Sequence, residues 1–377
     1  FSILWNSAQK FFGRFNLFRI LLLKFNQYYF TINSKEIKKI INENKPNILI
    51  TSSPGFLNYD LFIINEFKKF KIKIISFLIS WDHASGLGYI RSKCDLYLVW
   101  GKNSKNDLIN YSNVSSDSIK IVGPLHWKYH FDKKNLIDKK MFFENNNIDI
   151  NKKTILISLK SPTRTNINEI INFLNKLSII KKLNHETQFI IKPHPINFVK
   201  KYRKELIKIE KFCYLRKNFN ITNNYYDSNK NQEYISEKNG DLNYQIKNLN
   251  AENIYNYNLL SHSDLMINFF STLNIEAAIH GLNSINYVFE THNKNYSDTI
   301  DRKNLHIDYN QVHNYRLSNS GGTSVCFSFE ELLDLIDIKI KQKKENNQLM
   351  NKMVYNEISR DTFKSHLNAL MYINDVN

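Results

Sequence analysis

The clearest chemical signal is a histidine held between two prolines at the end of an apolar run. Residues 188–191 are followed by Lys192, Pro193, His194 and Pro195. Proline fixes its own φ, so two prolines stiffen the backbone where a strand leaves a sheet and hold the imidazole at the sheet's edge. There the histidine can donate a charge-assisted hydrogen bond to a leaving phosphate, and the lysine adds a second cation. The alternative is a proline-rich turn with an incidental histidine.

Hydroxyl and carboxylate residues follow a second apolar run, residues 264–269. Ser271 and Thr272 stand where a helix is predicted to start, and Glu276 lies about one turn further on. The N–H groups at a helix start suit a phosphate, as do the two hydroxyls. The carboxylate can accept hydrogen bonds from both hydroxyls of a ribose. The alternative is plain capping of the helix, with the glutamate facing solvent.

A third loop, after the apolar run 74–80, carries a carboxylate beside glycines. Asp82 can act there as a general base that orients or deprotonates a hydroxyl, or it can cap the following turn. His83 is a second base candidate in the same loop. Gly86 and Gly88 lack the third glycine of the dinucleotide fingerprint, so they do not indicate NAD binding.

A fourth loop offers two cations and two hydroxyls to a phosphate. It follows the apolar run 154–159 and contains Lys160, Ser161, Thr163 and Arg164. Basic side chains in a loop are commonly just solvated, and this is the alternative interpretation.

The elements that position these loops are short apolar runs that alternate with helical stretches. Such alternation predicts parallel, doubly wound sheets. A polar stretch, 132–153, separates two blocks of strands. We therefore predict an α/β fold of two Rossmann-like domains facing a cleft, with ligands at the carboxyl ends of the strands. The predicted strands are 47–53, 73–80, 95–101 and 119–123 in the first block, and 154–159, 187–192, 264–269 and 284–289 in the second.

The same pattern predicts the domain boundaries. We expect an N-terminal domain over 1–145, a C-terminal domain over 150–340, and C-terminal helices over 341–377. Residues 1–30 are predicted to form an amphipathic helix that packs on the protein or contacts a membrane surface. Residues 214–256 are rich in Asn, Tyr and Lys and are predicted to be a surface insertion.

Composition narrows the classes of partner. The 377 residues include 52 Lys and Arg against 35 Asp and Glu, a net charge of +17, which favours an anionic partner: nucleic acid, a phospholipid surface or a phosphorylated substrate. No basic tail or nucleic-acid module is present, so no nucleic acid is expected. Three distant cysteines support neither a disulfide framework nor a zinc site and fit a reducing cytoplasm. No two aspartates stand two apart, so a D-x-D metal clamp is missing.

An ordered set of motifs resembles a bacterial group of GT-B glycosyltransferases for surface or capsular polysaccharides. This group is similar to the CDP-glycerol glycerophosphotransferases and to sialyl- and Kdo-transferases with His-Pro and Ser-Thr motifs. The resemblance covers roughly residues 45–340. It rests on the loop 81–88, Val99-Trp100-Gly101, Ile121-Val122-Gly123-Pro124, the Lys-Pro-His-Pro turn, the Ser-Thr-x-x-x-Glu helix start, His313 with Arg316, Gly321-Gly322 and the segment 329–333.

The resemblance implies metal-independent transfer of a sugar from a nucleotide sugar bound by the C-terminal domain. CMP- or CDP-linked donors are favoured over UDP-linked ones, and no other cofactor is expected. His194 would contact the donor phosphate, Ser271 and Thr272 would hold the same phosphate, and Glu276 would bind the nucleoside. Asp82 is the base candidate in an N-terminal, acceptor-side domain. The other acceptor-side residues are Trp81, His83, Ser85 and Gly86.

Other functions stay open at this point. They are a CDP-glycerol-type polyol phosphotransferase, a UDP-sugar 2-epimerase, which needs no acceptor, and a non-catalytic scaffold for glycan assembly. The expected acceptor is a cell-surface glycan or a lipid-linked glycan. Because a nucleotide needs only a few cations, the remaining charge and the Phe- and Lys-rich segment 1–30 predict a cytoplasmic protein with peripheral contact at the inner face of the cytoplasmic membrane.

Overall fold

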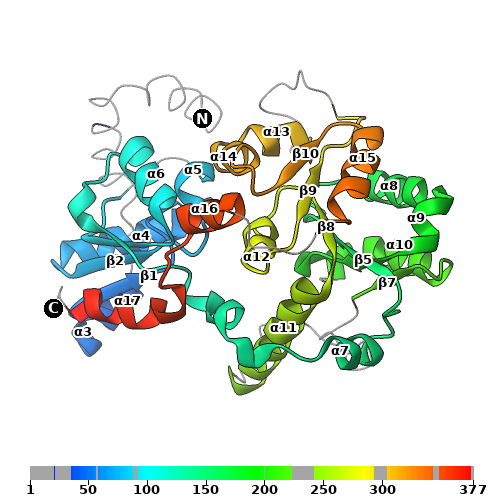
Figure 1. Ribbon diagram of the computed structural model, residues 1–377. Helices are drawn as coiled ribbons and strands as arrows, with labels where there is room; N and C mark the ends of the chain where they lie inside the picture. The colour runs from blue at the N-terminus through cyan, green and yellow to red at the C-terminus, as the bar shows by residue number, and fades with distance from the viewer. Residues whose placement is uncertain are drawn as a thin grey trace. The chain divides into compact units, whose positions relative to one another are not determined.

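The chain forms two compact units, each built around one parallel sheet (Figure 1). The first unit comprises Phe1–Lys128 and Tyr355–Asn377, and the second comprises Tyr129–Val354. The predicted helix over 1–30 lies outside the described residues, apart from Leu21. The structure, a computed structural model, describes residues 21, 35–56, 58–87, 90, 92–198, 200–222, 242–292, 304–342 and 348–374.

The sheet of the first unit has four parallel strands in the order β1-β2-β3-β4. They are β1 (Ile48–Thr51), β2 (Lys73–Phe77), β3 (Leu96–Val99) and β4 (Ile119–Ile121). Each lies within a predicted strand. Because every connection steps in the same direction, right-handed crossovers place the connecting helices on one face. The helices of this unit are α3 (Lys35–Asn44), α4 (Asn58–Lys69), α5 (His83–Gly86), α6 (Lys102–Ser112) and α17 (Ser365–Asn374).

The last helix of the chain covers the other face of this sheet. Side chains alternate along a strand. Tyr97 and Val99 therefore pack in the cluster that includes α4 and α6, whereas Leu96 and Leu98 pack with Ala369 of α17. The C-terminal residues thus complete the core of the first unit instead of forming a separate helical region.

Two glycines allow the returning chain to pack closely. A Cβ at Gly101 would overlap the backbone of Glu357. At Gly123, where φ is +86°, a Cβ would lie 2.6 Å from Ser365 Oγ and 2.8 Å from Thr362 Oγ1. Both glycines belong to motifs that the sequence singled out, and in the structure both serve packing.

The sheet of the second unit has six parallel strands in the order β10-β9-β8-β5-β6-β7. This is the doubly wound order, and it reverses between β5 and β8. Four strands match the prediction. β7 and β10 were not predicted, because three residues are too short to stand out as an apolar run. The strands are β5 (Lys153–Ser158), β6 (Thr187–Lys192), β7 (Phe219–Ile221), β8 (Leu265–Asn268), β9 (Ser284–Tyr287) and β10 (Ser324–Cys326).

Helices cover both faces of this sheet, because successive strand residues point to opposite sides. Ile155 and Ile157 of β5 pack in one cluster, and Leu156 between them packs in another. The described helices are α7 (Lys139–Asn145), α8 (Ile167–Ile179), α9 (Lys181–Glu186), α10 (Arg203–Tyr214), α11 (Leu242–His262), α12 (Leu273–Ile279), α13 (Leu305–Asn310), α14 (Val312–Ser318), α15 (Phe329–Lys339) and α16 (Gln348–Glu357), whose residues from Tyr355 on belong to the first unit.

The structure differs from the predicted boundaries in two places. Phe142 and Phe143 of α7 are buried against α11, so the polar stretch 132–153 belongs to the second unit and is not a linker. Residues 242–256 of the predicted insertion belong to α11, where Tyr255 is buried. In both cases a few buried aromatic side chains outweigh a mostly polar composition.

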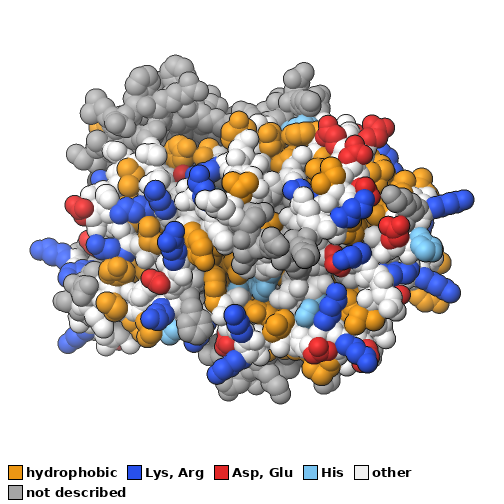
Figure 2. Space-filling view, in the orientation of Figure 1, with side chains coloured by type: hydrophobic (Ala, Val, Ile, Leu, Met, Phe, Trp, Pro, Cys, Tyr) orange, Lys and Arg blue, Asp and Glu red, His pale blue; other side chains and the backbone are white. Residues whose placement is uncertain are grey.

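Basic side chains do not gather in one patch on the described part of the face seen in Figure 2. In the view of Figure 2, Lys and Arg side chains are distributed across the visible face among apolar and uncharged ones. The three cysteines are unpaired and buried. Within the described part of the chain, no helix has the length and apolar character needed to cross a membrane.

Candidate functional site

The predicted residues of the second unit meet at the carboxyl ends of β8, β5 and β6. These three strands are neighbours in the sheet, and they are parallel. Lys160 follows β5, His194 follows β6 and Ser271 follows β8. The sheet thereby gathers three loops that are far apart in sequence at the point where the strand order reverses, which is where ligands bind in such sheets.

A buried carboxylate holds the cations of the loop after β5. Lys160 Nζ lies 2.8 Å from Asp308 Oδ2 on α13 and 3.4 Å from the carbonyl oxygen of Phe270. Arg164 Nη1 lies 3.9 Å from Asp308 Oδ1. Thr163 Oγ1 lies 2.8 Å from Ser161 Oγ within the same loop. The lysine side chain is only 11% exposed, so the interpretation as a freely solvated cation is wrong for Lys160.

The loop after β8 is held in an unusual backbone conformation. Phe270 has φ +56°, a region that non-glycine residues seldom occupy, and such residues concentrate at functional sites. Its N–H donates to Asn286 Oδ1 at 3.0 Å. Asn274 Nδ2 donates to the same oxygen at 2.9 Å, and Asn286 Nδ2 donates to Thr323 Oγ1 at 3.0 Å. This buried network keeps the loop in its strained shape.

The hydroxyls of this loop differ in their contacts. Ser271 Oγ donates to Asn268 Oδ1 at 2.9 Å and accepts from the N–H of Leu273 at 3.3 Å. Thr272 is the N-cap residue of α12, but its side chain makes no capping hydrogen bond. The Ser271 hydroxyl therefore accepts a backbone N–H at the start of α12, as a capping residue does, whereas the Thr272 side chain makes no capping bond.

His194 is a neutral hydrogen-bond donor in this structure. The N–H of Ile196 donates to its Nδ1 at 3.2 Å, so the ring proton sits on Nε2. Burial, together with the charges of Lys192 and Lys160, lowers the pKa of His194 to about 4. A hydrogen bond from this neutral N–H to a phosphate would still be charge-assisted, because the accepting oxygen is ionised. An anionic ligand would raise this pKa again, because a nearby negative charge favours the imidazolium.

The prolines and Lys192 complete this turn. Pro193 is buried, and Pro195 opens a short 3₁₀ helix, a position where a missing N–H costs nothing. Burial lowers the pKa of Lys192, and the carboxylates of Glu252 and Glu276 act in the opposite direction. The charge of Lys192 thus acts on His194 and also interacts with the carboxylate of Glu276.

Glu276 does not face solvent. Its side chain is 14% exposed, and its Oε2 lies 3.1 Å from His130 Nε2. The hydroxyl of Tyr129 also hydrogen-bonds the carboxylate; burial, followed by the charges of Glu276 and Glu252 and by this bond, raises the pKa of Tyr129. Neither partner could be predicted from the sequence, because nothing in a polar segment 146 residues away marks His130 as a neighbour of Glu276.

The loop that follows β2 in the first unit contains Asp82 and His83. Asp82 Oδ1 accepts a hydrogen bond from Ser80 Oγ, and its side chain makes no capping bond to α5. Burial lowers the pKa of His83. Ser85 and Gly86 form the end of α5, and their N–H groups donate to the carbonyl of Asp82. Trp81 is 2% exposed and lies in the core, which gives it a packing role, and its contact with an acceptor stays a prediction.

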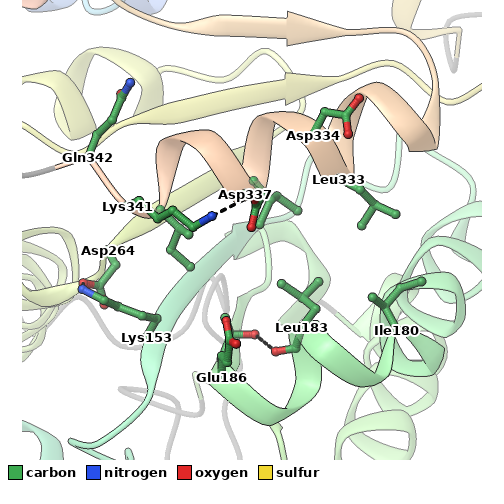
Figure 3. A pocket seen from close by; sticks show the side chains of 13 residues that line it. Lys153, Ile180, Leu183, Glu186, Asp264, Leu333, Asp334, Asp337, Lys341 and Gln342 are labelled. Atoms are coloured by element: carbon green, nitrogen blue, oxygen red, sulfur yellow. Dashed lines mark hydrogen bonds and ion pairs between the residues drawn. The ribbon is translucent and has the colours of Figure 1, made fainter.

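The second unit also has a cavity of about 800 Å³ at the amino ends of its strands (Figure 3). Lys153 and Asp264 pair there at 2.9 Å, and Lys341 and Asp337 pair at 2.8 Å. None of the predicted site residues lines this cavity, which lies at the end of the sheet opposite to the loops described above. No cluster of three or more metal-ligating side chains occurs within the described ranges.

Solved structures share this architecture. A UDP-GlcNAc 2-epimerase from Neisseria meningitidis bound to UDP-GlcNAc aligns with a TM-score of 0.52 at 14% identity, over 90% of this chain and 79% of that one. MnaA of S. aureus in a co-structure with UDP aligns with a TM-score of 0.51 at 14% identity, over 91% and 78%. No protein-family model matches the chain, and no curated protein matches it. At this identity the likeness shows the fold, and the predicted α/β architecture of two Rossmann-like domains is confirmed.

Proposed function

We propose that the chain is a glycosyltransferase that binds a nucleotide sugar at the carboxyl edge of its second sheet. The observation that carries this proposal is the convergence of Lys160, Lys192, His194 and Glu276 where the strand order reverses. Two cations and a neutral N–H donor suit the phosphates of the donor, and a fixed carboxylate suits the hydroxyls of its ribose.

In this proposal the second unit stabilises the leaving nucleotide. His194 donates its Nε2 proton to a phosphate oxygen, while Lys160 and Lys192 balance the charge that develops as the sugar–phosphate bond breaks. Ser271, Thr272, Thr163 and Arg164 lie in the same loops and are proposed to contact the phosphates. Glu276 is proposed to accept hydrogen bonds from the ribose. These groups would do the work that a metal does in other transferases, so turnover should persist in EDTA.

The first unit is proposed to supply the general base. Asp82 follows a strand end, and its side chain makes no capping hydrogen bond to α5. Its carboxylate is therefore proposed to take a proton from an acceptor hydroxyl. We propose a cell-surface or lipid-linked glycan as acceptor, with peripheral contact at the inner membrane face.

A UDP-sugar 2-epimerase is the second candidate. It is favoured by the structural likeness to the Neisseria meningitidis enzyme, which carries UDP-GlcNAc. An epimerase converts a nucleotide sugar without any acceptor. Incubating the protein with UDP-GlcNAc alone, and analysing the sugar nucleotide by NMR, separates the two: a C2 epimer supports the epimerase, and unchanged substrate favours the transferase.

Nucleotide binding is the direct test of the proposal. A ligand that binds only the folded state stabilises it by about 2.7 kcal/mol at 100 times its Kd. We expect CMP, CDP or UDP to raise the melting temperature by a few degrees, with cytidine nucleotides favoured by the resemblance to His-Pro transferases. GDP serves as the non-matching nucleotide. Absence of any shift with all four would overturn the proposal and favour a non-catalytic scaffold.

A further inference from the structure

A chain of hydrogen bonds leads from Glu276 into the second unit. Glu276 Oε2 lies 3.1 Å from His130 Nε2. His130 Nδ1 lies 2.9 Å from His280 Nε2, and His280 Nδ1 lies 2.9 Å from Ser261 Oγ. The hydrogen-bonded chain joins three separate segments: the 3₁₀ helix Leu125–Phe131, helix α12 with its C-cap residue His280, and helix α11.

When both imidazoles are neutral, the hydrogen bonds assign each ring proton in this chain to one particular nitrogen. An ionised carboxylate only accepts, so His130 must carry its proton on Nε2 and accept on Nδ1. His280 must then donate from Nε2, which leaves its Nδ1 to accept from the hydroxyl of Ser261. Each donor meets one acceptor from the serine to the glutamate.

Packing fixes the two rings in place. The His130 side chain is fully buried, and its ring centroid lies 4.0 Å from that of Tyr129 and 5.1 Å from that of His280. The ring of Tyr257 meets His280 edge-on at 4.7 Å. Rings held on several sides have little rotamer freedom, so the carboxylate that is hydrogen-bonded to His130 is also held.

We infer that His130 and His280 are positioning residues of the nucleotide site, which fix the carboxylate of Glu276 as an oriented acceptor for ribose hydroxyls. The inference rests on the proposed function. Side-chain groups that a ligand would otherwise have to order cost binding free energy, and a pre-oriented carboxylate avoids that cost. The pair should therefore act on the discrimination between a ribonucleotide and its 2′-deoxy form.

The experiment compares the affinities of CDP, 2′-deoxy-CDP, UDP and 2′-deoxy-UDP by isothermal titration calorimetry. His280→Leu removes the donor to His130. His280→Gln keeps an N–H near the position of the imidazole Nε2. Glu276→Gln removes the negative charge and replaces one of the two accepting oxygens with an N–H₂ donor. His185→Leu, at an exposed position on α9 of the same unit, is the matched control.

We expect His280→Leu and Glu276→Gln to weaken ribonucleotide binding about tenfold and to leave 2′-deoxynucleotide binding within about twofold, because a hydrogen bond to a charged group is at stake. His280→Gln and His185→Leu should stay close to the parent protein for all four ligands. A merely structural role of His280 would instead weaken both classes of ligand equally.

The outcomes separate the two claims. If the parent protein binds none of the four nucleotides, the proposed function and this inference both fail. If the parent binds and Glu276→Gln loses discrimination while His280→Leu keeps it, the inference alone fails. Should His280→Leu not fold, long-range ¹H–¹⁵N NMR of the parent decides: protons on Nε2 of both rings support the chain, and a proton on Nδ1 of His130 overturns it.

Discussion

The residues of the sequence motifs have different surroundings in the two units. In the first unit, Trp81 is buried in the core, and Gly101 and Gly123 make room for the C-terminal segment. In the second unit, Lys192 and His194 are only partly buried, and neighbouring charges and burial shift the pKa of each. Motifs of equal prominence in the sequence thus mark close packing in one unit and a polar cluster in the other.

Burial combined with polar partners distinguishes the two cases. A glycine or tryptophan at a strand end is explained once its neighbours are in van der Waals contact. A lysine, a histidine and a glutamate gathered at one sheet edge are not explained by packing, because burying them costs free energy. A ligand-binding role is therefore expected more strongly for the cluster in the second unit than for the motifs of the first. The four predictions below test that contrast.

The largest effect is expected in the first unit, from Gly101→Ala. The added Cβ would meet the backbone of Glu357, which cannot move as a flexible side chain can. Overpacking of this kind costs about 3 kcal/mol of unfolding free energy. Urea denaturation measures it, with Lys102→Ala at the exposed next residue as control. Equal stability of the two variants would show that the C-terminal segment does not pack here.

His194→Ala should affect activity without affecting the fold. Loss of one donor to developing charge on a leaving group lowers kcat about 100-fold or more. The measurement is sugar transfer with the nucleotide sugar chosen by the binding screen, alongside circular dichroism. His185→Ala, an exposed histidine on α9, should turn over normally. Near-normal turnover of the His194 variant would remove this residue from the mechanism.

Asp82→Asn tests whether the first unit contributes chemistry at all. A general base contributes roughly 100-fold or more, so kcat should fall by about that factor while nucleotide affinity stays unchanged. Asp117→Asn, at an exposed position in the same unit, is the control. If the two variants turn over equally, the base lies elsewhere and the Asp82 loop is structural.

The smallest effect is a pH dependence of stability caused by His194. Its pKa in the folded protein is about 4, against an ordinary value of 6.5, so the unfolded chain binds the proton more readily between these values. The stability that neutral His194 contributes to the folded state is fully present above pH 6.5 and is lost as the pH falls towards 4. Between pH 7 and 5 the parent should lose on the order of 1 kcal/mol more unfolding free energy than His194→Asn. Parallel pH profiles would contradict the buried, neutral state of this histidine.

Much of the fold could be predicted from local pattern. All eight predicted strands occur, because apolar runs between helical stretches have few alternatives to a buried parallel strand. The short strands β7 and β10 could not be found this way. The stretch 132–153 was assigned wrongly, because its polar composition hides Phe142 and Phe143, which decide its packing.

The site could be predicted only in part. The position of Lys160, His194 and Ser271 at one sheet edge could be predicted, because each follows a strand and parallel neighbours bring such residues together. Asp308 and His130 were not found. Asp308 pairs with Lys160, which lies 148 residues earlier (308 − 160 = 148). No local sequence pattern predicts a partner at that separation.

The sequence by itself determined the alternation of strands and helices, the positions of the loops and the residue types that those loops offer, because these depend on neighbours along the chain. Only the tertiary structure decided which of these residues pack and which cluster. It returned α17 to the first sheet, buried Trp81, and joined Glu276 to His130 and His280. Burial and hydrogen-bond partners depend on residues brought together from distant parts of the chain, and they set both the pKa of His194 and the orientation of Glu276.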